Sequence, residues 1–172
     1  MPKSTALPLA YVVVRLLVVL NWLYAGVVVA ILVGLFTRPE WTMTALGVSE
    51  AARTATFLIG LRAIAALGLV AIPLNLGLLK RLLEMIATVR SGDPFVASNA
   101  YRLQAIAWIL LGQQVLSIAV ALVARFISTP GHSLHLDAGF SPSAALAVVM
   151  TFVLARVFAE GTLMRADLEG TV

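Results

Sequence analysis

One apolar stretch, residues 9–36, constrains the fold of this chain more than any other feature, because Arg15 is its only charged residue. A membrane-crossing α-helix needs roughly 20 predominantly apolar residues, and the apolar core of a signal peptide has only about 7 to 15. The stretch exceeds both lengths, and no small-residue cleavage site followed by a polar region is evident. We therefore expect residues 9–36 to form a membrane-spanning helix of the mature protein.

Three further apolar segments follow, at residues 54–79, 97–127 and 142–164, and Ser49 with Glu50 predicts the amino-terminal cap of the first of them. The whole chain is 61% hydrophobic and 12% charged, with a mean hydropathy of +1.02, whereas soluble domains are about half apolar and a quarter charged. Its 172 residues leave little for a soluble core. The sequence predicts an all-α integral membrane protein, a four-helix transmembrane bundle with a single membrane domain over residues 1–172.

The central segment, residues 80–102, interrupts this apolar pattern. After residue 79 apolar and charged positions alternate at helical spacing up to Arg90, so the second helix is expected to continue as an amphipathic cytoplasmic extension over residues 80–90, either free or lying on the membrane. Ser91 and Gly92 predict its end, and Asp93 and Pro94 predict a turn before the third helix.

The distribution of basic residues predicts the orientation. The side that holds the two termini and the central segment carries twice as many Lys and Arg residues as the other side. The first group is Lys3, Lys80, Arg81, Arg90, Arg102 and Arg165, and the second is Arg38, Arg53 and Arg125. Cytoplasmic loops are enriched in basic residues. We expect a multi-pass protein of the bacterial inner membrane, with both termini in the cytoplasm and with anionic lipid headgroups as partners of its basic residues.

Several polar side chains fall inside the apolar segments: Arg15, Asn21, Arg62, Gln113, Arg156 and Glu160. Snorkelling to the nearest interface is the simplest interpretation of Arg15 and Arg62. Arg156 and Glu160 are one helical turn apart and predict an ion pair, which Arg15 would join to hold the first helix against the fourth. Asn21 and Gln113 predict hydrogen bonds between helices; a polar path in a small transporter-like protein is the alternative.

Nothing in the sequence predicts catalysis or a cofactor. There is no Cys, no Gly-rich phosphate loop and no metalloprotease motif. The sequence predicts no metal site, although His132, His135 and Asp137 in the loop before the fourth helix leave a divalent metal open as an alternative. Direct nucleic-acid binding is not expected, because the basic residues are dispersed between apolar segments.

On the fourth helix small residues recur every four positions, which favours close packing within the bundle or across a homo-oligomer. These residues are Ser143, Ala147, Thr151, Ala155 and Ala159.

Two stretches of the chain resemble a known family. The central stretch has Gly92, Asp93, Pro94 and Phe95, followed by Asn99, Arg102, Leu103 and Ile106, and the carboxyl-terminal stretch has Val157, Phe158, Glu160, Gly161, Leu163, Asp167, Leu168, Thr171 and Val172. These residues are similar to the two conserved patterns of the bacterial membrane-protein family catalogued as domain of unknown function 2975, the YoaS-like proteins. The order Arg102-Leu103 and the glycine at position 170 depart from those patterns.

The resemblance implies a four-helix membrane protein of unknown biochemical activity, often encoded beside a small helix-turn-helix regulator of the Cro type. By analogy this chain would be a regulatory or sensor partner that docks such a DNA-binding regulator in the cytoplasm, and the lack of catalytic motifs predicts that it is not an enzyme. The partner-binding residues would be Lys80, Arg81, Arg90, Gly92, Asp93, Pro94, Phe95, Asn99 and Arg102. A structural or lipid-interacting bundle is the alternative, in which Gly92 to Phe95 are only a corner between helices.

Overall fold

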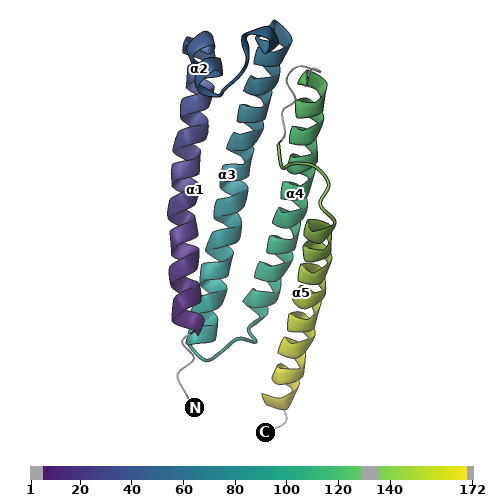
Figure 1. The fold of residues 1–172 in the computed structure, drawn as a ribbon. Helices are drawn as coiled ribbons and strands as arrows, with labels where there is room; N and C mark the ends of the chain where they lie inside the picture. The colour runs from purple at the N-terminus through teal and green to yellow at the C-terminus, as the bar shows by residue number, and fades with distance from the viewer. Residues whose placement is uncertain (1–5, 129–135, 170–172) are drawn as a thin grey trace. The chain divides into compact units, whose positions relative to one another are not determined.

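The structure, a computed structural model, describes residues 6–128 and 136–169, without the side chains of Ala6 and of residues 166–169 (Figure 1). The described part of the chain consists of α-helices and one short 3-10 helix, and contains no β-strand. In chain order the elements are α1 (Ala6–Thr37), α2 (Pro39–Ala45), η1 (Glu50–Ala52), α3 (Ala55–Arg90), α4 (Ala97–Ile127) and α5 (Pro142–Glu169).

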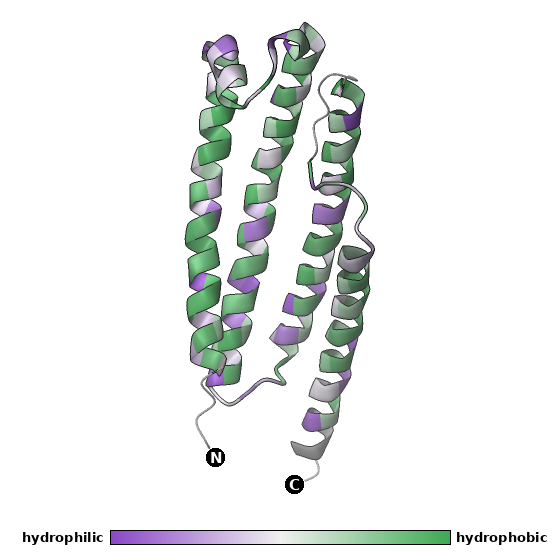
Figure 2. Cartoon of the chain, viewed as in Figure 1, coloured by the Kyte–Doolittle hydropathy of each residue, from purple (hydrophilic) through white to green (hydrophobic). Residues whose placement is uncertain are grey.

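Four of these helices are long and apolar enough to cross a membrane, namely Leu7–Thr37, Ala55–Arg90, Ala97–Ile127 and Pro142–Arg165. Figure 2 shows hydrophobic residues along most of their length. The predicted all-α fold with four membrane-spanning helices is therefore confirmed. The helical extension is also present, because α3 continues without a break to Arg90.

The connection between the first two long helices contains two short helical elements, α2 and η1. Pro39 begins the short helix α2, where its missing N–H costs nothing. Ser49 precedes η1 and makes no side-chain cap. The cap of α3 is Thr54, whose hydroxyl accepts a hydrogen bond from the N–H of Phe57 at 3.2 Å. The prediction that Ser49 caps this helix is therefore wrong, because η1 intervenes.

The chain divides into two compact units, and the boundaries between them fall inside α1, α3 and α4. The unit comprising Asn21–Pro73 and Gln113–Ser141 contains a cluster of buried apolar side chains. This cluster is formed by Leu35, Met43, Val48, Ala52, Phe57, Ala65 and Ile127. Helix α2 and η1 thus cover an apolar end of the long helices within this unit.

The other unit comprises Met1–Leu20, Leu74–Gly112 and Pro142–Val172, so it contains parts of all four long helices. Here α3 and α4 meet at a tight corner, residues 91–96, and α5 packs beside both the corner and the first turns of α4. All nine residues that the sequence singled out as a partner-binding site lie in this unit.

Candidate functional site at the α3–α4 corner and the α4–α5 groove

The backbone of the corner is fixed by the way α3 ends. Gly92 has a φ of +86°, a left-handed conformation that disfavours residues with a Cβ. Its N–H donates to the carbonyl of Val89, and the N–H of Asp93 donates to the carbonyl of Thr88, both at 3.1 Å. These two bonds form a Schellman motif, which satisfies carbonyls that the helix end would leave unpaired. The glycine predicted to stop the helix therefore does so by a defined geometry.

Asn99 holds the corner from inside and has no exposed surface. Its side-chain amide donates to the hydroxyl of Thr88 at 2.8 Å and to the carbonyl of Pro94 at 2.9 Å. Its Oδ1 accepts a hydrogen bond from Arg102 at 2.9 Å. One buried side chain thus ties the end of α3, the corner and the first turn of α4 together.

Arg102 adds a second link between the same helices. Its Nε lies 2.8 Å from a carboxylate oxygen of Glu84 on α3, and its Nη1 also donates to the hydroxyl of Ser98 at 3.0 Å. A guanidinium with a fixed fork of donors suits this kind of multiple contact. Asn99 and Arg102 are therefore positioning residues of the corner, and the buried Asn99 can affect a partner only through the shape of the corner.

The end of α5 is joined to the corner. Arg165 on α5 forms an ion pair with Asp93, although the two residues are 72 positions apart. The rings of Phe95 and Phe158 lie 5.4 Å apart between centroids. A Cβ added at Gly161 would lie 3.2 Å from the Phe95 ring, so a glycine allows the ring to approach this closely. Residues from both stretches that carry the family resemblance thus meet at one place.

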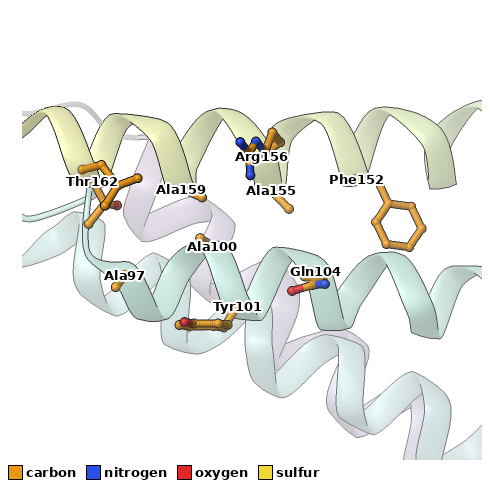
Figure 3. A pocket seen from close by; sticks show the side chains of 10 residues that line it. Ala97, Ala100, Tyr101, Gln104, Phe152, Ala155, Arg156, Ala159 and Thr162 are labelled. Atoms are coloured by element: carbon orange, nitrogen blue, oxygen red, sulfur yellow. The ribbon is translucent and has the colours of Figure 1, made fainter.

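Beside these contacts a groove of about 460 Å³ runs between α4 and α5. Figure 3 shows that its side chains come from the first turns of α4 and from α5 between Phe152 and Thr162. Four of its ten lining residues are alanines, and the other six are polar or large. The residues are Ala97, Ala100, Tyr101, Gln104, Phe152, Ala155, Arg156, Ala159, Thr162 and Leu163. This α4–α5 groove was not anticipated, because only the small-residue repeat on α5 hinted that the two helices come close.

The predicted basic residues have different surroundings. Lys80 and Arg90 are exposed, and Arg90 lies over the ring of Tyr11 at 5.4 Å from its centroid. Arg81 is half-buried and donates to the carbonyl of Gly77 in its own helix at 2.9 Å. At 1.5 Å per residue, Lys80 lies about 15 Å back along α3 from Arg90. The basic residues therefore do not form one patch at the corner.

Arg156 and Glu160 form the predicted ion pair along α5. Arg15 instead stacks on Tyr11 in its own helix, with its guanidinium 4.8 Å from the ring centroid. Within the described residues there is no ion pair between Arg15 and Glu160, so the expected three-residue link between α1 and α5 does not form. The arginine finds a nearer partner in the tyrosine one turn away.

Arg62 makes contacts that snorkelling to the membrane interface does not explain. It donates from two nitrogens to the carbonyl of Leu35, at 2.8 and 3.2 Å, and stacks over Phe36 at 4.4 Å. Leu35 belongs to the last turn of α1, whose carbonyls lack helical partners and carry a partial negative charge. Arg62 therefore caps the carboxyl end of α1 from the neighbouring helix.

The predicted intramembrane amides also differ from one another. Asn21 is buried, and its amide donates to the carbonyl of Ile72 on α3 at 3.4 Å. Gln113 is half-buried on α4. Its neighbour Gln114 donates to the carbonyl of Gly139, 2.9 Å away in the connection that precedes α5. Hydrogen bonding between segments accounts for the Asn21 nitrogen and for Gln114, whereas the buried Oδ1 of Asn21 has no partner within the described residues.

The loop histidines His132 and His135 lie outside the described residues, and Asp137 lies within them. No group of residues suitable for holding a metal ion occurs in the described part of the chain. The alternative of a metal in this loop depends on the two histidines outside the described residues and stays a prediction.

The helices define the class of this protein as a multi-pass membrane protein of four spanning helices, and one of its two units contains the α3–α4 corner and the α4–α5 groove. No protein-family model, curated protein or solved structure matches the chain. The argument for function consequently rests on the residues themselves.

Proposed function

We propose that this chain is a non-enzymatic regulatory protein of the bacterial inner membrane, with both termini in the cytoplasm, that docks a small helix-turn-helix regulator at the α3–α4 corner. The observation that carries the proposal is the meeting of Phe95 with Phe158 and Gly161. These residues come from two separate stretches, each of which resembles the same family. Their convergence supports the resemblance and, with it, the expected partner.

The chemistry of the corner suits a protein partner. Phe95 is 45% exposed and offers an apolar ring at the rim of a backbone that Asn99 holds rigid. Arg90, the last residue of α3 before the corner, is exposed and adds a positive charge. An aromatic anchor beside a charge on a preorganised support is a common composition for a binding hot spot. The partner surface would combine an apolar pocket with an acidic rim.

Lys80 and Arg81 take a different part in this proposal. They lie several turns back along α3, where they would interact with anionic lipid headgroups and fix the depth of the helix. A reporter fused to the carboxyl terminus tests the orientation on which this assignment depends. Reporter activity in the cytoplasm is expected, and activity on the outer side would contradict both the topology and the docking surface.

The docking itself is tested with the full chain in detergent and the purified product of a neighbouring gene that encodes a small helix-turn-helix protein. Arg90→Glu is expected to weaken binding about tenfold, because it places like charge against the acidic rim. Arg38→Glu, an exposed change next to α2, is the matched control and should bind like the wild type. Equal binding by both variants, or the absence of such a gene, would favour the alternative of a structural or lipid-interacting bundle.

A further inference from the structure

The ion pair on α5 faces outward. The side chain of Arg156 is 78% exposed and that of Glu160 is 47% exposed, although both belong to a helix that is apolar enough to span the membrane. Arg156 lines the α4–α5 groove, and Glu160 directly follows the lining residue Ala159. A pair of opposite charges that is open to the lipid side is costly unless something polar covers it.

The neighbouring residues indicate the depth of the groove. Tyr101 lines the groove and is 72% exposed, and the next residue, Arg102, pairs with Glu84 of α3. Tyrosines and ion pairs of this kind are typical of the membrane–water interface. The headgroup layer there is about 5 to 8 Å thick on each side of the hydrocarbon core. The end of the groove near Tyr101 would therefore open among lipid headgroups.

The groove continues from this level into the hydrocarbon region. Along α5 it extends from Leu163 to Phe152, which at 1.5 Å per residue is about 16 Å. Phe152 makes an edge-on contact with Trp108, with ring centroids 5.3 Å apart, so the inner end of the groove is aromatic. From Arg156 to Phe152 the groove extends about 6 Å along α5, which is enough for the first carbons of an acyl chain, and the rest of the chain would lie in the bilayer.

We propose that the α4–α5 groove binds one phospholipid that carries a primary ammonium in its headgroup, of the phosphatidylethanolamine class. The phosphate lies against the Arg156 guanidinium and the ammonium lies against the Glu160 carboxylate. The acyl chain follows the groove toward Phe152. The site is distinct from the corner, and the proposal does not depend on the docking of a regulator.

Charge complementarity selects this headgroup. An anionic headgroup such as glycerol phosphate would pair with Arg156 but would leave Glu160 facing a negative charge. A choline headgroup is positive but has no N–H to donate to a carboxylate. The ethanolamine headgroup satisfies both side chains, with charge-assisted hydrogen bonds that are stronger than neutral ones.

The rest of the lining fits the same ligand. Four alanines line the groove, and their small side chains leave space for the ligand. They are Ala97, Ala100, Ala155 and Ala159. The hydroxyl of Tyr101 and the amide of Gln104 are polar groups at the level of the phosphate and the glycerol esters. Thr162 donates its hydroxyl proton to the carbonyl of Phe158 at 2.8 Å, which leaves its oxygen as an acceptor.

The experiment measures lipid binding to the full detergent-solubilised chain by native mass spectrometry, with phosphatidylethanolamine, phosphatidylglycerol and phosphatidylcholine of the same acyl composition. The wild type is expected to bind phosphatidylethanolamine at least about tenfold more tightly than the other two. Arg156→Gln should weaken phosphatidylethanolamine binding about tenfold. Glu160→Gln should abolish the preference over phosphatidylglycerol, because the ammonium loses its partner while the phosphate keeps Arg156.

Arg15→Gln is the matched control, because it removes another arginine from an apolar segment and lies outside the groove lining. It should leave lipid binding unchanged. The wild-type preference alone already tests the proposal if a variant fails to fold. Equal or tighter wild-type binding of phosphatidylglycerol, unchanged binding by Arg156→Gln, or a lipid-free dimer that excludes all three lipids would overturn it.

Discussion

The corner between α3 and α4 should depend on Asn99 for much of its stability. Asn99→Ala removes two hydrogen bonds donated to Thr88 and Pro94 and one accepted from Arg102. Each such bond contributes about 1 kcal/mol net, and the one to the charged group somewhat more. Thr88 and Arg102 keep other partners, at Met85 and Glu84. We expect a loss of about 2 to 4 kcal/mol in the free energy of unfolding.

The measurement is reversible unfolding of the purified chain in mixed micelles with increasing denaturing detergent, followed by circular dichroism. Ser98→Ala is the matched control, because Ser98 also accepts a hydrogen bond from Arg102 but is exposed. It should cost less than about 0.5 kcal/mol. A loss for Asn99→Ala no larger than that of the control would refute the assignment of Asn99 as the centre of the corner.

Two further predictions concern the other unit. Arg62→Gln should lower the free energy of unfolding by about 2 kcal/mol, because it removes a cationic cap from the carboxyl end of α1. The control is Arg38→Gln, a change at an exposed arginine, which should leave thermal stability in detergent unchanged. Gly60→Leu should lower the free energy of unfolding by roughly 1 to 3 kcal/mol, because a side chain at Gly60 collides with Ile127. Gly26→Leu is its control, because nothing lies within 4 Å of a Cβ added there. Equal melting temperatures for the two variants would contradict this packing.

The fold could be predicted from the sequence because membrane helices depend mainly on local composition. Each apolar segment satisfies its own backbone hydrogen bonds, so its length and hydrophobicity alone identify it. The ion pair of Arg156 and Glu160 was equally predictable, since a spacing of four residues places both on one face of a helix. Gly92 followed from the turn chemistry that ends α3.

The remaining contacts depend on packing between distant segments, which one sequence does not specify. The position of Arg62 opposite the last turn of α1 depends on how α3 lies beside α1. Asn99 looked like a surface residue of a polar segment and is fully buried, because the corner folds around it. Only the predicted proximity of the corner and the carboxyl-terminal tail indicated that Asp93 and Arg165 would pair.

The link between Gln114 and Gly139 has a consequence for the bilayer itself. The N–H of Gly139 donates to the Ser117 hydroxyl at 2.9 Å, so non-helical backbone lies against α4 at Ser117. Along α4, Ser117 lies about 15 Å before the helix end at Ile127, which is half the roughly 30 Å thickness of a hydrocarbon core. Polar backbone is poorly tolerated in contact with acyl chains. The bilayer beside this connection should be locally thinned, and the protein should prefer membranes with shorter acyl chains.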